Sequence, residues 1–417
     1  MIKTNHNFGF LLLVTVFLFA FRIPAEGFNF YINYLLCTLL AIFYIGKNGK
    51  IPVKKTFNIY FTAFTVLSVF LALINYYNVS NVFEQFFVII FFTNIYFLVF
   101  HSYKYDIKAI ISTYLKISYF VSLIGIIEEI SHLLGFTLTF LSKNVSIVEF
   151  GLIRISSIAS EPAQLVVLLL PAVFIISMNI IIRFDIKLTK FQKFTIVLAY
   201  LLTFSTTGLF GLFICVFILI FLKFNIKMLA ITFLSIFIFS MVINKFELIN
   251  TRIVDTQNVL INENYDDANI STMTLYSNLQ VAINSFKENP LMGSGLGTHN
   301  DNYMKYINKI ASEVQLEMQL NTYDANSLLL RLITETGFLG LILFYGFIIK
   351  FSLFRKKPLN NDQFILKAAN LGILAMVIMK SARSGNYIIN GFPFFLLLYY
   401  YTYIKFSITK LNEVTTD

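Results

Sequence analysis

The chain has 417 residues, of which 57% are hydrophobic and 13% are charged, and its formal net charge is +10. Soluble domains carry about 25% charged residues, so this composition excludes a protein that folds in water. The excess of lysine and arginine does not indicate nucleic-acid binding, because these residues form short clusters between apolar runs, where they set membrane topology. The two cysteines lie inside apolar runs and predict no disulfide framework.

Apolar runs follow one another along most of the chain. A bilayer core of about 30 Å needs about 20 apolar residues per helix, and with this criterion the sequence predicts an all-α integral membrane protein of about twelve transmembrane helices. The first run is followed by Arg22-Ile23-Pro24, a poor cleavage site, so we interpret it as a helix and not as a signal peptide. The predicted spans lie near 8–22, 28–46, 57–76, 81–101, 109–131, 163–182, 194–206, 208–222, 228–244, 328–349, 364–380 and 387–404.

Basic clusters predict the orientation of these spans. The clusters at 47–55, 183–193 and 350–357 all fall on one side of the membrane, and the positive-inside rule makes this side cytoplasmic. Lys3 near the start of the chain and Lys405 and Lys410 near its end then place both termini in the cytoplasm.

Residues 194–222 decide the rest of the topology. We predict two short segments broken at Ser205-Thr206-Thr207-Gly208, because the break returns Lys223 and Lys227 to the basic side. It also places the loop 245–327, with five basic and ten acidic residues, outside. The chain then comprises helices 1–9 in residues 1–244, this extracytoplasmic loop, and helices 10–12 with a cytoplasmic tail in residues 328–417. A polar turn at membrane depth is tolerated only where it is packed in protein or lines a cavity.

The long loop is expected to contain ordered structure. Ser271 can cap an amphipathic helix that runs to about Glu288, and Asn289-Pro290 ends it. A glycine-rich segment follows at 293–298. Its spacing is a weak match to a dinucleotide-binding turn, but it follows a helix and not a strand, so we discard that interpretation. We expect a lid on the membrane surface and not a separate domain.

Six cations remain on or near the outer side. Arg331 is the most informative, because it lies just inside a predicted span, where an arginine costs about 2.5–3.5 kcal/mol on insertion scales. It can be a structural partner of Glu335 at the i,i+4 spacing. It can also bind a phosphorylated ligand, since a guanidinium holds phosphate oxygens bidentately. The six residues are Arg22, Arg154, Arg252, Arg331, Lys380 and Arg383.

Two other features carry candidate site residues. The segment from Arg154 to Pro162 is unusually polar for one that leads directly into a span. Helix capping explains Ser160, Glu161 and Pro162 but not Arg154. His299 is the only histidine of the long loop and could act as a base, although an ordinary surface histidine is the simpler interpretation.

Together these motifs resemble the bacterial O-antigen polymerase (Wzy) family of the O-antigen ligase and polymerase superfamily. The segment 289–298 looks like the family's Pro-x-x-Gly-x-Gly-x-Gly-Thr motif, and 335–340 resembles the Glu-x-Gly-x-x-Gly that opens the helix after the large loop. The segment 154–162 looks like the family's Arg-x-Ser approach to a span, and 205–208 resembles a serine-rich break. Each motif is loose, whereas their order and spacing are specific and cover most of the chain.

The resemblance implies a glycosyltransferase of the bacterial cytoplasmic (inner) membrane that uses no metal and no cofactor. Its donor would be an oligosaccharide on undecaprenyl diphosphate, whose charge arginines must neutralise as it leaves. A base must take the proton of an acceptor hydroxyl. Membrane lipid, a flippase and a chain-length-determinant protein are the candidate partners, and no nucleic acid is expected. The residues expected to hold the diphosphate or glycan are Arg154, Arg252, Arg331 and Arg383, and the candidate catalytic residues are Arg331, Glu335, Glu161 and His299.

One departure from the related ligases favours a polymerase. Those ligases carry a histidine at the position of Asn326, eleven positions before the glycine that is Gly337 here. Asparagine cannot act as a base, so we predict a polymerase of O-antigen or capsule polysaccharide that joins lipid-linked repeat units. Thr206 and Thr207 are a second departure, because many members have an arginine at this break. The alternatives are an O-antigen ligase that transfers glycan to lipid A core, and a transporter that flips lipid-linked oligosaccharide.

Overall fold

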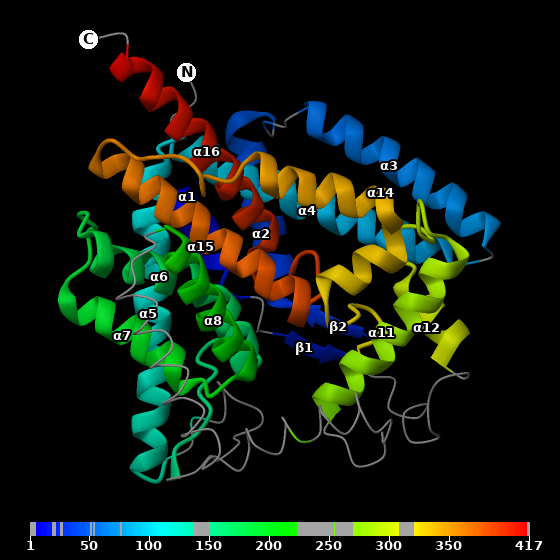
Figure 1. Ribbon diagram of the computed structural model, residues 1–417, viewed down its shortest axis with the longest axis horizontal. Coiled ribbons are helices and arrows are strands. Elements are labelled where there is room, and N and C mark those ends of the chain that lie inside the picture. Colours follow the sequence, from blue (N-terminus) through cyan, green and yellow to red (C-terminus); the bar gives the residue numbers. More distant parts are fainter. Residues whose placement is uncertain are drawn as a thin grey trace.

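The protein is built almost entirely of helices in the computed structural model (Figure 1). The structure describes residues 6–18, 22–25, 28–50, 52, 55–75, 77–136, 138, 151–222, 254, 270–307 and 321–414. The predicted span 228–244 lies outside these residues. The elements are α1 (His6–Thr15), β1 (Arg22–Ala25), β2 (Phe28–Tyr31), α2 (Ile32–Asn48), α3 (Lys55–Ile74), α4 (Val79–Ser102), α5 (Ile107–Leu133), α6 (Pro162–Ile182), α7 (Lys190–Leu202), α8 (Thr206–Leu222), α11 (Ile270–Glu288), α12 (His299–Ile307), α14 (Leu328–Lys350), α15 (Asn361–Arg383), the 3₁₀ turn η3 (Ile389–Gly391) and α16 (Phe392–Val414).

Five of the described helices are long and apolar enough to cross a membrane, namely α4, α5, α6, α14 and α15. Shorter apolar helices are α1, α2, α8 and the part of α3 at 62–74. These helices confirm the prediction of a helical membrane protein. The number of membrane crossings stays a prediction.

Two short strands, which the sequence did not predict, stand beside the helices of the otherwise all-α fold. Strands β1 and β2 pair antiparallel, with Arg22 opposite Tyr31. The first predicted helix is therefore shorter than expected and ends at Thr15. Pro24 has no backbone N–H and would disrupt a helix, whereas an edge strand accepts it.

Helices α6 and α15 form the centre of the bundle. They pack along each other, with α5, α8, α14 and α16 around them (Figure 1). Every residue of α6 from Leu165 to Ile176 is buried, as expected for a helix that is apolar on all sides. Gly372 of α15 permits the close approach, because a Cβ at this position would lie 2.9 Å from the carbonyl oxygen of Pro171.

The predicted break between two short helices is confirmed. Helix α7 ends at Leu202 and α8 begins at Thr206. The Leu202 carbonyl accepts a hydrogen bond from the Ile155 N–H at 3.3 Å. The Tyr200 hydroxyl donates to the Gly208 carbonyl at 2.9 Å. The turn is thus packed in protein, which satisfies its backbone groups.

The loops that precede α5, α7 and α15 share one end of the bundle. Lys108 of α5 pairs with Asp362 of α15 at 2.6 Å. The backbone N–H of Asp185, which follows α6, donates to Asn361 at 2.6 Å. Helices α11 and α12 lie on the other side of the molecule from the C-terminal end of α16 (Figure 1). Two of the three basic clusters, 183–193 and 350–357, therefore lie at the same end, and the orientation in the membrane stays a prediction.

Helix α14 bends at Gly337, and the segment 289–298 fills the bend. Gly337 has φ 57° and ψ −156°, a conformation that is essentially restricted to glycine. The bend opens the hydrogen-bond ladder of the helix, and the backbone of the segment pairs with the groups that are released. These bonds run from Ser294 N–H to Thr334 O at 3.0 Å, from Gly295 N–H to Glu335 O at 2.9 Å, from Phe338 N–H to Pro290 O at 2.9 Å and from Leu339 N–H to Leu291 O at 2.9 Å.

Close backbone contacts explain the glycines of both motifs. A Cβ on Gly337 would lie 2.6 Å from the nitrogen of Gly293, and a Cβ on Gly293 would lie 2.5 Å from the carbonyl carbon of Glu335. A Cβ on Gly297 would lie 2.6 Å from the carbonyl oxygen of Asn81 in α4. The glycine-rich segment is therefore a structural wedge between α4 and α14.

Candidate functional site

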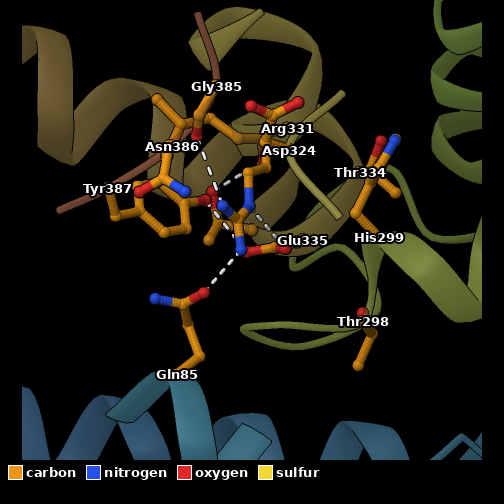
Figure 2. Close-up of polar contacts among 12 residues, drawn as sticks. Gln85, Thr298, His299, Asp324, Arg331, Thr334, Glu335, Gly385, Asn386 and Tyr387 are labelled. Carbon is orange, nitrogen blue, oxygen red and sulfur yellow. Dashed lines mark hydrogen bonds and ion pairs between the residues drawn. The ribbon is translucent and has the colours of Figure 1, made fainter. Parts of the chain in front are cut away.

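Arg331 is the centre of a buried hydrogen-bond network near the start of α14 (Figure 2). Its Nε donates to Glu335 Oε1 at 2.9 Å, which confirms the predicted i,i+4 pair. Nη2 donates to Gln85 Oε1 of α4 at 2.6 Å, and Nη1 donates to the Gly385 carbonyl at 3.3 Å. The ring of Tyr387 lies 4.1 Å from Cζ, and its hydroxyl donates to Glu335 Oε2 at 2.9 Å.

This network joins α4, α14 and the loop between α15 and α16. A guanidinium has five N–H donors, and the described residues engage three of those of Arg331. Two donors are left for a further acceptor. A buried ion pair is costly to break, at about 3–5 kcal/mol when one partner is removed.

Two further charged side chains adjoin this network. Asp324, in the turn before α14, interacts electrostatically with Arg331 and Lys380. Burial raises the pKa of the Asp324 carboxyl, and the two positive charges oppose this rise. Lys380 is buried in α15, donates to Ser384 Oγ at 3.0 Å and lies 4.9 Å from the ring of Phe392. We name Arg331, Lys380, Asp324 and Glu335 the Arg331 cluster.

The turn that carries Asp324 is fixed on both sides. Ser327 caps α14 by accepting the Leu330 N–H at 3.2 Å, and its hydroxyl donates to the Ser381 carbonyl of α15 at 2.6 Å. The Asn326 N–H donates to Asp324 Oδ1 at 3.0 Å. Residues 325 and 326 have φ 55° and 51°. Such backbone conformations cost about 1–3 kcal/mol each and concentrate at functional sites.

His299 is fully buried, so its interpretation as an ordinary surface histidine is wrong. Its Nε2 lies 2.9 Å from Asn278 Oδ1, and the amide nitrogen of Asn278 donates to the Thr274 carbonyl at 2.7 Å. This amide orientation requires Nε2 to carry the proton. Nδ1 keeps its lone pair and has no hydrogen-bond partner among the described residues. Burial, and secondarily the charge of Arg331, lowers the pKa of His299 to about 3.

The segment 151–162 is anchored on two glutamates of α5. Glu128 Oε2 accepts the backbone N–H groups of Ser156 at 3.1 Å and Ser157 at 2.7 Å. Glu129 accepts the N–H of Ile153 at 3.3 Å. Arg154 is partly buried between these anchor points. The polarity of the segment thus serves in part to attach it to α5.

The other predicted site residues lie in different places. Glu161 is exposed at the N-terminus of α6, and its side chain makes no capping hydrogen bond. Arg383 is the partly buried last residue of α15. Arg252 lies outside the described residues. The structure therefore brings Arg331, Glu335 and His299 together and does not place Glu161 in the Arg331 cluster, while the roles of all these residues stay predictions.

The Arg331 cluster has the composition of a site for a charged reaction. Buried cations stabilise negative charge strongly, because the protein interior screens it less than water does. A carboxylate beside them can accept a proton. The two neighbouring helices α11 and α12 cover this end of α14.

The fold and this cluster define a multi-pass helical membrane protein with a charged site beneath a pair of loop helices. Residues 192–345 match the family model described as O-antigen ligase, which supports the resemblance to the O-antigen ligase and polymerase superfamily. The matched range contains His299, Arg331 and Glu335. No curated protein matches the chain. The match supports a ligase-type or polymerase-type function and a glycosyltransferase-like enzyme, without distinguishing the two types.

Three residues that complete the site were not predicted from the sequence, and Lys380 was predicted as an outer cation but not as a site residue. Asp324 and Lys380 each stand at the edge of an apolar run, which is the signal that could have identified them. Gln85 and Tyr387 contribute neutral polar groups from helices and loops far away in the sequence. Only the packing of α4 and of the loop after α15 against α14 shows that they belong to the site.

Proposed function

We propose that the protein is a polysaccharide polymerase, which joins undecaprenyl-diphosphate-linked oligosaccharide repeat units at the outer face of the cytoplasmic membrane. The observation that carries this proposal is the Arg331 cluster, a set of cations and carboxylates in a chain whose residues 192–345 match the O-antigen ligase family model. The diphosphate of a lipid-linked donor needs positive charge when it leaves. Arg331 would provide it through the two N–H donors that the described residues leave available.

The other arginines enter the proposal as donor contacts. Arg154, Arg252 and Arg383 would hold the diphosphate or the first sugars, and Glu161 and His299 would orient or deprotonate the substrates. The expected orientation places the loop 245–327 outside and both termini in the cytoplasm. The grouping of the basic clusters 183–193 and 350–357 at one end of the bundle supports this orientation.

Asn326 favours the polymerase over the ligase. It lies directly before the capping residue Ser327, in the turn that carries Asp324. The related ligases have a histidine at this position, and an asparagine amide has no basic lone pair to replace it. The ligase is the second candidate, because the matched family model is described as O-antigen ligase.

The first test is deletion of the gene, followed by complementation and separation of the surface glycan on a gel. A polymerase deletion should reduce the ladder of chain lengths to a single attached repeat unit, and the wild-type gene should restore the ladder. Arg331→Ala should leave polymer formation about 10²–10³-fold below wild type, as when one donor to a developing anion is removed. Arg355→Ala is the matched control, since Arg355 is exposed in the loop before α15.

The amount of each variant in the membrane must be measured by immunoblot, because Arg331→Ala leaves Glu335 unpaired in the interior. Arg331→Lys keeps the charge and loses the planar fork, so it tests the same claim with less destabilisation. Loss of all attached glycan on deletion would indicate a ligase or a flippase. A ladder that deletion leaves unchanged would contradict the proposal.

A further inference from the structure

We propose that Asp324 is the base that accepts the proton of the acceptor-sugar hydroxyl, a role that rests on the proposed transferase function. Asp324 lies beside Arg331 in the turn that leads into α14 (Figure 2). Its side chain is partly exposed, whereas Arg331, Lys380 and Glu335 are buried. Asp324 is therefore the least buried member of the Arg331 cluster.

The hydrogen bonds and the burial of the neighbouring groups distinguish Asp324 from the other candidates. Both oxygens of Glu335 are occupied, Oε1 by Arg331 and Oε2 by the Tyr387 hydroxyl. His299 has a free Nδ1, but its ring is fully buried, so burial and not hydrogen bonding sets it apart from Asp324. Asp324 uses Oδ1 to accept the Asn326 N–H. Its Oδ2 accepts no hydrogen bond from the described residues and is available to a sugar hydroxyl.

Two other carboxylates at this end serve the attachment of α12. Glu288 pairs with Lys305. Asp301 Oδ2 accepts the backbone N–H of Asn78 at 3.3 Å and the side-chain amide of Asn81 at 3.4 Å, which attaches α12 to the start of α4. Glu288 and Asp301 are thus engaged elsewhere. Among the described carboxylates of this end, Asp324 is the one that lies next to Arg331 and Lys380 and has an oxygen without a hydrogen bond.

The backbone holds Asp324 in position. A Cβ on Gly385 would lie 1.6 Å from the carbonyl oxygen of Asp324, so the turn and the loop after α15 are in direct backbone contact. The bond from Ser327 to Ser381 fixes the other end of the turn. The left-handed conformations of Ala325 and Asn326 direct the chain around the carboxylate. A base must be held in this way to be effective.

The electrostatic surroundings suit a base. Arg331 and Lys380 are the charged groups that act on Asp324, and Glu335, His299 and Tyr387 lie one step further away, around Arg331. Burial raises the pKa of Asp324 above the ordinary value of an aspartate, which makes its carboxylate a better proton acceptor. The cations keep the carboxylate ionised before the reaction.

The proposed reaction transfers the donor glycan from the lipid diphosphate to the acceptor hydroxyl. The acceptor hydroxyl oxygen forms a bond to the anomeric carbon of the donor glycan, and the bond from that carbon to the diphosphate oxygen breaks. Undecaprenyl diphosphate leaves with the electron pair of the broken bond. The hydroxyl proton passes to Asp324 Oδ2 and then to solvent.

The test uses the full-length protein in nanodiscs, with the lipid-linked repeat unit that accumulates in the deletion strain as both donor and acceptor. Asp324→Asn should lower kcat about 10²–10⁴-fold, the usual contribution of a general base, while KM changes by less than a few-fold. Asp324→Glu should retain part of the activity. Its rate should fall on the acidic side at a different pH from that of wild type. Asp362→Asn is the control, because Asp362 is a half-exposed aspartate at the opposite end of the bundle.

The outcomes separate this inference from the proposed function. If the wild-type protein does not lengthen the repeat unit, the transferase function itself is contradicted. If wild type is active and Asp324→Asn matches it, or raises KM at unchanged kcat, Asp324 is not the base. If Asp324→Asn does not fold, as judged by gel filtration, Asp324→Glu decides. If the rate of Asp324→Glu then falls in acid at the same pH as the rate of wild type, the proposal is overturned.

Discussion

Arg331 and His299 are both buried and ionisable, but Arg331 is charged and His299 is neutral. Arg331 is charged because Glu335 supplies a counter-ion at 2.9 Å and two further acceptors complete its contacts. His299 faces the neutral amide of Asn278 and the positive charge of Arg331, and both favour the uncharged imidazole. Glu335 therefore keeps Arg331 ionised, while the surroundings of His299 keep its imidazole neutral.

The neutral state of His299 predicts a loss of stability in acid. The folded pKa of about 3 lies below the ordinary value of 6.5, so the unfolded chain binds a proton in a range where the folded chain does not. The free energy of unfolding should be unaffected by this residue above pH 6.5. It should fall by up to about 1.4 kcal/mol per pH unit as the pH decreases toward 3.

Thermal unfolding of the purified protein between pH 7.5 and 5 measures this effect. His299→Gln is the informative variant, because its amide can still donate to Asn278 but does not titrate. Its unfolding temperature should depend less on pH than that of wild type. Equal slopes for the two proteins would contradict the buried neutral imidazole.

At the scale of elements, the bend of α14 and the segment 289–298 depend on each other. The segment pairs with backbone groups that the bend leaves open, and the bend requires a residue with positive φ at Gly337. Gly337→Ala introduces a Cβ 2.6 Å from the Gly293 nitrogen, in a conformation that alanine adopts only with strain.

We expect Gly337→Ala to reduce the amount of folded protein and to lower the unfolding temperature. Gly346→Ala is the matched control in the same helix, since a Cβ there meets nothing within 4 Å and alanine favours a helix by about 1 kcal/mol over glycine. Fluorescence-detected gel filtration with a temperature ramp compares the two variants. Similar behaviour of both would show that the wedge is dispensable.

Elements governed by local sequence could be predicted. The helix expected from Ser271 to Glu288 is α11, and the break at 205–208 separates α7 from α8. The i,i+4 spacing was enough to predict the Arg331–Glu335 pair. The β-ribbon was missed because residues 28–31 belong to an apolar run that also fits the start of a span, while residues 23–25 fell between two predicted spans.

Features that depend on distant contacts could not be predicted. Gln85 and Tyr387 reach Arg331 from 246 and 56 positions away along the chain. The burial of His299 depends on α11, whose Asn278 holds the ring. Hydrophobic periodicity assigns faces to a helix, but it does not identify the neighbour of each face.

At the scale of the whole molecule, the bundle has two chemically different ends. Lys108, Asp362 and the basic loops lie at one end. The Arg331 cluster and the glycine-rich wedge lie at the other, beneath α11 and α12. A membrane protein with this asymmetry is expected to have one fixed orientation.

Labelling of single introduced cysteines tests the orientation. Tyr323→Cys lies in the turn before α14 at a position that is 70% exposed, and a membrane-impermeant maleimide should modify it in intact cells. Lys190→Cys, at the exposed start of α7, should react only after permeabilisation. The native Cys37 and Cys215 are buried and should add little background. The reverse pattern would invert the topology.

The wedge also sets an order for the biogenesis of the protein. The two carbonyl groups and two N–H groups that the bend exposes would be unpaired in a newly inserted α14 that lacked the segment 289–298. The ribosome synthesises the segment 289–298 before α14. The backbone groups that pair with the bend are therefore already present when α14 leaves the translocon. Maturation of α14 should therefore be fast in the natural chain order. A circular permutant that places 289–298 after α14 should accumulate as an incompletely inserted form.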